Sequence, residues 1–229
     1  MKKPLRKLLK IATTILVIFI SLSIFSVILF RFVQPPITPL MIIRYISNNS
    51  KNQERKLEKE WVGIEKISPD MILATVAAED NKFTEHFGID WEAIQKAKQI
   101  NKYSPVKHGA STITQQTAKN LFLIPSRTYL RKGFEVYFTF LLEVFWSKKR
   151  IMEVYLNIVE LGDGVYGIEA ASQKYFHKPA IKLTKRESAL IVAALPSPRK
   201  RNPSRPNAYM YYYQGRVLDL MQKIGKVEL

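Results

Sequence analysis

The sequence contains no cysteine, which excludes a disulfide framework and any thiolate metal site. Histidine is scarce too: His86, His108 and His177 lie far apart and lack the close pairing of common zinc motifs. Stretches that alternate apolar and polar residues are almost absent, and there is no internal repeat and no low-complexity tract. These absences favour a mainly α-helical protein without a metal site built from histidine or cysteine.

Acidic residues are also few. Asp and Glu total 19 against 36 Lys and Arg, and the formal net charge is +17 at pH 7. Such an excess suggests a polyanionic partner: nucleic acid, an anionic membrane surface or a phosphorylated substrate. Charge alone does not choose among them. The 229 residues, 47% of them hydrophobic, suit one packed domain together with an anchor.

The N-terminal segment has the pattern of a membrane anchor. Basic residues are frequent in positions 1–10, and Ile11–Phe30 then runs without a charge for about 20 residues, the length that crosses a bilayer core. The alternative is a cleavable signal peptide, but the apolar run is longer than a typical signal core and no small-x-small site follows it. Arg31 and a proline-rich stretch at 34–39 come next instead.

We therefore expect a retained transmembrane helix at residues 11–33. By the positive-inside rule its basic tail, residues 1–10, lies in the cytoplasm and everything after Val33 lies outside. Nucleic acid is on the other side of such a membrane, so this orientation argues against a nucleic-acid partner.

Helix signals recur beyond the anchor. Ser68-Pro69-Asp70 is a strong start, with an N-cap residue, a proline in the first turn and an acid against the positive helix end. The other predicted starts are Ser111-Thr112, Ser126–Thr128, Ser147 and Thr184, and the predicted breaks are Pro125, Gly162–Gly164 and Pro196–Pro198. The mixed-charge region Ser50–Glu60 indicates a surface helix or a linker.

Glu79 is the first candidate for chemistry. A helix from Pro69 to about Asp80 places Ile72, Thr75, Val76 and Glu79 on one stripe that should face the core. A carboxylate there is desolvated, which raises its pKa and suits it to proton transfer near neutral pH. The alternative is an internal ion pair or a cap for the following turn at 81–83.

The segment His108–Asn120 is unusually rich in uncharged polar residues. As a helix it aligns Thr112, Gln115, Gln116 and Lys119 on one face, with apolar residues largely on the other. A face with many donors and acceptors but no acid suits a sugar or a phosphate. A solvated surface is the alternative, and patterning alone does not separate the two.

A basic cluster follows, formed by Arg127, Arg131 and Lys132 with Glu135 one helical turn after Arg131. The Arg131–Glu135 pair fits a simple i,i+4 salt bridge of little energetic weight. It also fits a cationic cradle for a pyrophosphate, steadied by an acid of the same helix. The apolar run Phe134–Trp146 that continues from it indicates either core packing or a surface that dips into lipid.

Together these segments resemble glycosyltransferase family 51, the peptidoglycan glycosyltransferases, in their monofunctional biosynthetic form. The family pattern E-D-x-x-F-x-x-H-x-G-x-D is complete from Glu79 to Asp90, and G-G-S-T-I-T-Q-Q-x-x-K-N matches Gly109–Asn120 with Ala110 in place of the second glycine. The other blocks are R-K-x-x-E at Arg131–Glu135, Lys149–Asn157 and Glu187–Pro196. Five ordered blocks over about 67–206 are far more specific than one short motif.

The resemblance implies a fold and a reaction. The fold is a lysozyme-like helical head with a smaller membrane-associated lobe, at residues 67–229, after a linker and membrane-proximal segment at 34–66. The reaction polymerises lipid II into β-1,4-linked glycan with inversion at the anomeric carbon and release of undecaprenyl pyrophosphate. Glu79 is then the general base, and Lys119 and Arg127 stabilise the leaving group. Glu135 is the second acid, which positions the basic cluster or a divalent ion.

The resemblance also implies the surrounding roles. The expected substrate-binding residues are Ser111, Thr112, Gln115, Gln116, Asn120, Arg131 and Lys132, and the expected supporting residues are Asp80, Phe83 and His86. We expect no obligatory cofactor and no protein-only metal site, with a divalent cation, Mg²⁺ or Mn²⁺, as an addition at the pyrophosphate. The expected location is the inner membrane with a periplasmic catalytic domain, alongside cell-wall synthesis or division proteins.

Two rivals remain. A lytic enzyme that cleaves the same glycan also uses one glutamate on a lysozyme-like fold, but hydrolysis has no pyrophosphate for the basic residues to neutralise. A non-catalytic membrane scaffold of the wall-building machinery is the other; the presence of both Glu79 and Glu135 with the full basic set argues against it. We expect no transpeptidase domain in a chain of this length.

Overall fold

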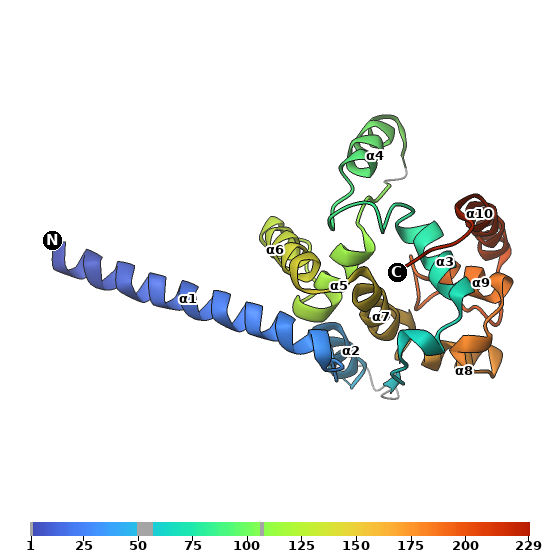
Figure 1. The fold of residues 1–229 in the computed structure, drawn as a ribbon, viewed down its shortest axis with the longest axis horizontal. Coiled ribbons are helices and arrows are strands. Elements are labelled where there is room, and N and C mark those ends of the chain that lie inside the picture. The colour runs from blue at the N-terminus through green and yellow to red at the C-terminus, as the bar shows by residue number, and fades with distance from the viewer. Residues whose placement is uncertain (1, 50–56, 106–107) are drawn as a thin grey trace. The chain divides into compact units, whose positions relative to one another are not determined.

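A computed structural model describes residues 2–49, 57–105 and 108–229 of the chain. They fall into two compact units, Met1–Gln34 and Pro35–Leu229. The helices are α1 (Lys2–Phe32), α2 (Pro39–Asn49), α3 (Pro69–Glu79), α4 (Trp91–Tyr103), α5 (Ile113–Phe122), α6 (Tyr129–Phe145), α7 (Lys148–Ile158), α8 (Ile168–Phe176), α9 (Lys185–Ala194) and α10 (Ala208–Ile224) (Figure 1). The prediction of a mainly α-helical protein is confirmed.

The first unit is essentially the helix α1. It begins at Lys2, so the basic residues of the predicted tail lie on the same helix as the apolar residues that follow. The hydroxyls of Thr13 and Thr14 donate to the carbonyls of Leu9 and Lys10, each at 2.9 Å, as an apolar environment requires. Within Pro4–Phe32 an 18-residue window has a mean hydropathy of 2.6, and the helix is long and apolar enough to cross a membrane.

The second unit holds the predicted helix starts. Side chains of Ser68, Thr112, Thr128, Ser147 and Thr184 all accept a backbone N–H as N-caps of α3, α5, α6, α7 and α9. Thr112 and Thr184 also complete capping boxes with the residues three positions on. The predicted helix starts are therefore confirmed, because capping is a local property of the sequence.

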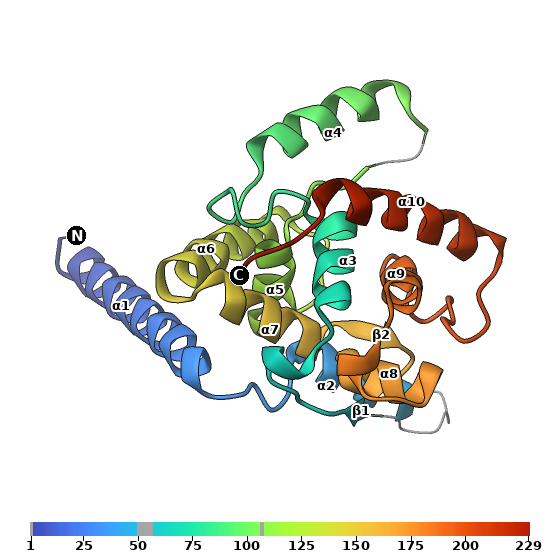
Figure 2. The ribbon, with the colours of Figure 1, turned by 45° about the vertical axis from the view of Figure 1, so that its right-hand side comes forward.

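Two groups of helices build the core of this unit. Helix α3 packs against α9 and α10, and α5 packs against α6 and α7 (Figures 1 and 2). Tyr155 and Ile151 of α7 and Ile113 of α5 are completely buried. Helix α4 lies apart from the other helices in both views and has no buried residue. Side chains at the C-terminal end of α3 and the N-terminal half of α5 meet between the two groups.

A small sheet was not predicted from the sequence. Strand β3 (Val165–Tyr166) pairs in parallel with β1 (Glu58–Lys59) and antiparallel with β2 (Glu160–Gly162). Such short strands carry too few residues to show an alternating pattern. Glu58 and Lys59 belong to the segment interpreted as a surface helix or linker, and they form a strand instead; residues 50–56 of that segment lie outside the described residues.

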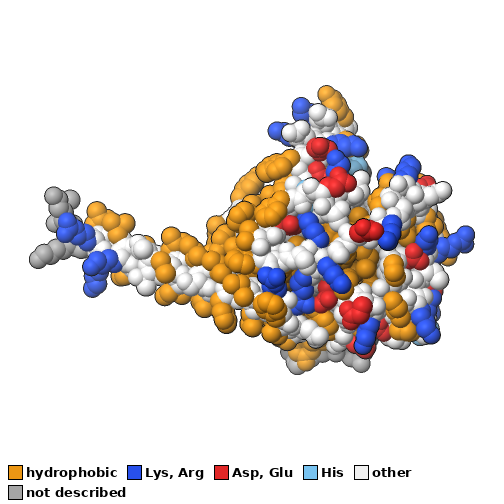
Figure 3. Space-filling model, viewed as in Figure 1, with side chains coloured by type: hydrophobic (Ala, Val, Ile, Leu, Met, Phe, Trp, Pro, Cys, Tyr) orange, Lys and Arg blue, Asp and Glu red, His pale blue; other side chains and the backbone are white. Residues whose placement is uncertain are grey.

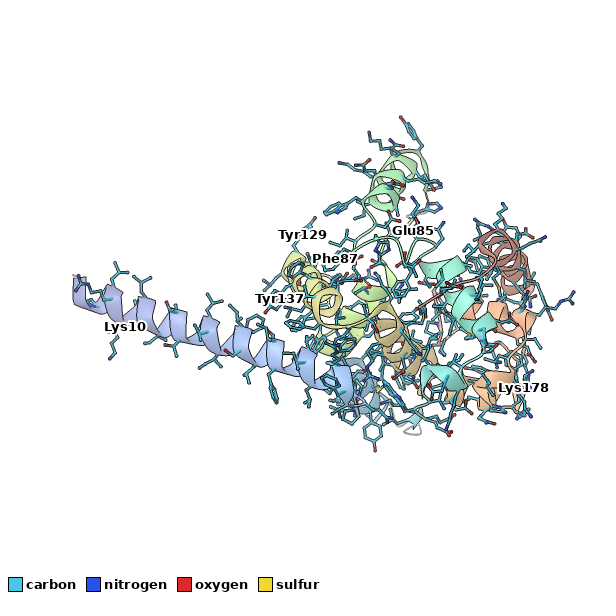
Figure 4. The ribbon with its side chains drawn as sticks, in the orientation of Figure 1. Lys10, Glu85, Phe87, Tyr129, Tyr137 and Lys178 are labelled. Atoms are coloured by element: carbon cyan, nitrogen blue, oxygen red, sulfur yellow. The ribbon has the colours of Figure 1, made fainter. Side chains whose placement is uncertain are left out.

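Helix α6 exposes an apolar face. Its exposed residues include Tyr129 at 98%, Leu130 at 72%, Phe140 at 57% and Val144 at 50%. Hydrophobic side chains gather over this helix in Figure 3, and Figure 4 labels Tyr129 and Tyr137 upon it, with Phe87 nearby. The ring of Phe87 packs edge-on against Phe140 with centroids 5.9 Å apart. Half of α6 is thus core, through Phe138 and Leu142, and half is an uncovered apolar surface of this unit.

Candidate active site

Glu79 is the last residue of α3. Ser68 caps the start of this helix, and the backbone N–H of Asp80 closes its end by donating to the carbonyl of Val76 at 3.0 Å. Thr75 and Val76 of the predicted stripe are buried, while Ile72 and Glu79 are partly exposed. The middle of the stripe is therefore buried in the core, and Glu79, at its C-terminal end, lies at the edge of a cleft.

Asp80 ties the end of α3 to the start of α5. Its Oδ2 accepts the backbone N–H of Ile113 at 3.0 Å, and its Oδ1 lies 2.8 Å from Nε2 of His86. A carboxylate at the first N–H groups of a helix is stabilised by the positive end of the helix dipole. Phe83, fully buried in the same loop, lies under Nζ of Lys148 at 4.7 Å from its ring centre. These three residues hold the chain that follows Glu79.

Thr112 and Gln115 are committed to the capping box of α5. The Thr112 hydroxyl accepts the N–H of Gln115 at 3.1 Å and donates to the carbonyl of Gly88 at 2.6 Å. The Gln115 side chain in turn accepts the N–H of Thr112 at 3.1 Å. Both residues are buried, so the polar face predicted for this segment is partly an interior face. Ala110 stands outside the left-handed region, since His177 is the only non-glycine with positive φ among the described residues, and its methyl group causes no backbone strain.

Gln116 contacts Glu79 directly. Its Nε2 donates to Oε2 of Glu79 at 2.6 Å, and the hydroxyl of Tyr155 lies 3.4 Å from its Oε1. Burial raises the pKa of Glu79, whereas the Gln116 hydrogen bond and the charge of Lys119 lower it in part. Burial also raises the pKa of Tyr155 well above its usual value, with smaller contributions from the charges of Glu79 and Asp80. Tyr155 therefore stays protonated, and Glu79 is a carboxylate suited to taking up a proton.

Lys119 lies one helical turn beyond Gln116. Burial lowers the pKa of Lys119; the charges of Arg131 and Lys132 lower it as well, and those of Glu135 and Glu79 raise it. The ammonium thus lies within electrostatic range of both candidate acids. A cation held there without full hydration interacts more strongly with a developing negative charge than one in bulk water.

Glu135, 2% exposed, gathers the cations of α6. Arg131 donates to one of its carboxylate oxygens and Lys132 donates to the other at 2.5 Å. The predicted i,i+4 pair is therefore part of a three-residue cluster, which is steadier than an exposed pair. Arg127 lies in the connection before α6 and is exposed, so its side chain is free to follow a ligand.

Three adjoining cavities form the cleft. The first, of about 460 Å³, contains Glu79, Ser111, Gln116, Lys119 and Asn120. The second, about 330 Å³, shares Lys119 and Asn120 and adds Arg127 and Arg131. The third, about 370 Å³, shares Glu79 and Ser111 and extends to Lys96 and Arg216. The structure thus brings most predicted site residues to one cleft. Thr112 reaches only the third cavity. Five predicted site residues line none of the three: Glu135, Gln115, Lys132, Phe83 and His86.

The residues of the cleft do not fit a divalent cation held by the protein alone. No group of three His, Asp or Glu side chains gathers within residues 2–49, 57–105 and 108–229. Each oxygen of Glu135, the acid closest to the basic cluster, is already paired with a cation. Mg²⁺ requires near-octahedral oxygen ligands, which these groups do not supply.

Sequence reasoning missed several residues of the cleft. Leu40 lines the first and second cavities, and Glu160 and Pro198 line the first. Lys96 and Arg216 line the third. Each lies outside α3 and α5, the helices that carry Glu79 and Gln116, and none carries a local pattern that distinguishes it from a surface or core residue. Only the folded chain reveals them.

The fold and the cleft define a mainly helical enzyme domain in which a carboxylate of raised pKa lies beside a cluster of cations. Comparison with known proteins gives the family. The protein-family model described as Transglycosylase matches residues 46–222, and the chain belongs to this family.

Three relatives named biosynthetic peptidoglycan transglycosylase show how far the similarity extends. The protein of Bacteroides thetaiotaomicron is 46% identical over 223 residues, 97% of this chain and 90% of its own length. That of Bdellovibrio bacteriovorus is 50% identical over 209 residues, 91% and 83% of the two chains. That of Caulobacter vibrioides is 46% identical over 227 residues, 99% and 93%.

Proposed function

We propose that this protein is a peptidoglycan glycosyltransferase that polymerises lipid II into β-1,4-linked glycan strands. The acceptor is lipid II, and the donor is the growing strand on its undecaprenyl pyrophosphate. The observation that carries the proposal is the shared cleft of Glu79 and Lys119, in which a carboxylate of raised pKa and a cation of lowered pKa face the same cavity.

Glu79 acts as the general base. It takes the proton from the 4-hydroxyl of the acceptor's terminal sugar while that oxygen attacks the anomeric carbon of the donor. The new carbon–oxygen bond forms on the face opposite the departing phosphate oxygen, so the α-linked donor becomes a β-linked product. Gln116 holds the carboxylate by its 2.6 Å hydrogen bond, so one oxygen stays available for the incoming proton.

The basic residues stabilise the leaving pyrophosphate. As the anomeric bond breaks, its electron pair stays on the phosphate oxygen, and negative charge grows on that group. Lys119, Arg127 and Arg131 line the cavity next to Glu79, where fixed cations stabilise such charge without reorganising. Glu135 keeps Arg131 and Lys132 in place. No step of this mechanism passes through a metal ion.

The membrane supplies the substrate. We propose that α1 crosses the inner membrane with its basic end in the cytoplasm, and that the catalytic unit lies on the periplasmic side. The apolar face of α6 then contacts lipid and the substrate's long tail enters the cleft from the bilayer. This arrangement leaves no nucleic acid among the partners.

The test incubates detergent-solubilised protein with purified lipid II and separates the products by size, with Glu79→Gln in parallel. Long strands from the wild type and none from the variant are expected. Gln116→Asn, which keeps an amide but shortens it, is a control for local disturbance and should retain part of the activity.

The rival functions give different products. Intact lipid II with both proteins would favour the scaffold and contradict the proposal. Cleavage of preformed glycan without polymerisation would favour the lytic enzyme. The basic cluster is the feature that a hydrolase does not need, since its reaction releases no pyrophosphate.

A further inference from the structure

Helix α2 contributes one residue, Leu40, to the wall of the cleft. Its residue Leu40 lines the cavity that contains Glu79 and also the cavity that contains Arg127 and Arg131. The family match begins at residue 46, so Leu40 and most of α2 precede the part of the chain that the family model covers. The cleft therefore includes a residue from outside the region that the family model matches.

Three sets of contacts hold α2 in this place. Met41 is fully buried, and the hydroxyl of Thr38 caps the helix by accepting the N–H of Met41 at 3.3 Å. Nζ of Lys59 donates to the carbonyls of Pro35 and Pro36 at 2.5 and 2.9 Å, which fixes the approach to the helix. The hydrogen bonds of Thr38 and Lys59 both lie within the second unit.

The third contact is an ion pair between Arg44 of α2 and Glu160 of β2. Nε of Arg44 lies 3.2 Å from Oε1 of Glu160, and its Nη2 donates to Oε2 at 3.4 Å. Glu160 is only 8% exposed and lines the same cavity as Glu79. Burial raises the pKa of Glu160, and Arg44 counteracts that shift. Loss of Arg44 leaves a poorly solvated carboxylate without its partner.

The second cavity has the two-sided chemistry of an amphiphile site. Lys119, Arg127 and Arg131 supply positive charge, while Leu40, Leu123 and Pro125 supply apolar surface within the same 330 Å³. A diphosphate alone would satisfy the cations but leave the apolar residues uncovered. A diphosphate ester of a hydrocarbon chain matches both sides, because its charged group meets the cations and its first carbons meet the apolar wall.

We propose that α2 is part of the substrate site, where Leu40 contacts the hydrocarbon next to the diphosphate of the lipid-linked substrate and the Arg44–Glu160 ion pair holds the helix against the cleft. This inference deepens the proposed function and rests on it for the identity of the substrate. Leu40 is here a specificity residue, and Arg44 and Glu160 are positioning residues.

The first test measures binding without turnover. The full chain in detergent is titrated with farnesyl diphosphate and with inorganic diphosphate, for the wild type, Leu40→Ala and Ile42→Ala. Ile42 is the matched control, since it is an exposed apolar residue of the same helix and lines none of the cavities. The wild type should prefer the farnesyl ester, and Leu40→Ala should lose about tenfold of that preference. Ile42→Ala should keep it.

The result that overturns the proposal is an equal preference in Leu40→Ala and the wild type, or an equal loss in both variants. An equal loss would mean that α2 matters through detergent contact and not through the cavity. The proposed function can fail separately: intact lipid II together with a Leu40-dependent farnesyl preference would retain the site and remove the polymerase. Polymerisation of lipid II together with an unchanged farnesyl preference in Leu40→Ala would retain the polymerase and remove the Leu40 site.

The second test addresses the ion pair. Arg44→Ala and Glu160→Gln should each raise KM for lipid II about tenfold or more while kcat changes little, because the wall is displaced and the base is not. The double variant Arg44→Glu with Glu160→Arg, which reverses the ion pair, should recover part of the affinity that the single variants lose. Arg44→Lys, which keeps the positive charge, should lose less affinity than Arg44→Ala. A fall in kcat at unchanged KM, or a melting temperature that falls in step with the activity, would show a structural role and contradict the proposal.

Discussion

Glu79 and Gln116 belong to different helices and meet through a hydrogen bond of 2.6 Å between the Gln116 amide and the Glu79 carboxylate. Asp80 brings these helices together, since the residue after Glu79 accepts the backbone N–H of Ile113 at the start of α5. The contact between α3 and α5 thus determines both where the Glu79 carboxylate lies and which side chain it contacts. The predictions below begin with this pair.

Replacing Gln116 by Leu should move the acid side of the activity profile to higher pH. Hydrogen bonds to charged groups contribute about 1.5–3 kcal/mol. Gln116 stabilises the ionised form of Glu79, so its loss raises the pKa of Glu79 further, and the base is protonated at a pH where the wild type still works. The measurement is the pH dependence of strand formation; an unchanged acid limb would remove Gln116 from this role.

The wild-type acid limb should itself lie above the range of an ordinary glutamate, because burial raises the pKa of Glu79. The proposed role of Glu79 as base requires its ionised form, so activity should be lost as the pH falls through that raised pKa. In Glu79→Gln the stability should not fall at neutral pH. Folding raises this pKa, and ionisation therefore costs folding free energy above it, a cost that the neutral amide removes. Thermal unfolding of both proteins across pH measures this.

Lys119→Ala should reduce turnover by about 100-fold or more, in the range found for removing one electrostatic donor from an active site, and Lys119→Arg should lose much less. Burial lowers the pKa of Lys119, so the wild-type rate should fall at alkaline pH earlier than an ordinary lysine predicts. In Lys119→Arg this alkaline limb should move upward, since arginine remains charged. Equal rates for the two variants would indicate that the side chain serves packing alone.

Asp80→Ala should destabilise the second unit by about 2–4 kcal/mol, because the N–H of Ile113 and the ring of His86 both lose a buried partner. Asp163→Ala is the control, as its partner Arg199 and its own side chain are both substantially exposed. Chemical denaturation followed by circular dichroism compares them. If the two variants unfold at the same denaturant concentration, Asp80 is not the link between α3 and α5.

Deleting Met1–Gln34 should leave a folded second unit with weaker partition into lipid vesicles, since the chain divides at that point. Some partition should remain through the apolar face of α6. Full retention of vesicle binding would show that α1 is not the main attachment. Extending the deletion through Asn49 removes Leu40 and Arg44 as well, and should impair substrate affinity in addition.

Local features of the fold were predictable from the sequence for physical reasons. The caps at Ser68, Thr112, Thr128, Ser147 and Thr184 depend on a side chain and the N–H groups two or three residues on, so a short window contains all the information. The long apolar run of α1 is likewise visible without any tertiary contact. The short strands at Glu58–Lys59 and Val165–Tyr166 were missed, because their pairing joins segments far apart in the chain.

The sequence by itself determined the helical class, the anchor and the motif residues that carry charge: Glu79, Lys119, Arg131 and Glu135. Only the tertiary structure decided how each is used. It turned Thr112 and Gln115 inward as caps, although their helical spacing placed them beside Gln116. It also brought Leu40 and Glu160 into the cleft from distant segments. The reason is that contacts depend on which elements pack together: the helical spacing predicted that burial raises the pKa of Glu79, but the Gln116 hydrogen bond and the Lys119 charge that oppose this shift come from the contact between α3 and α5.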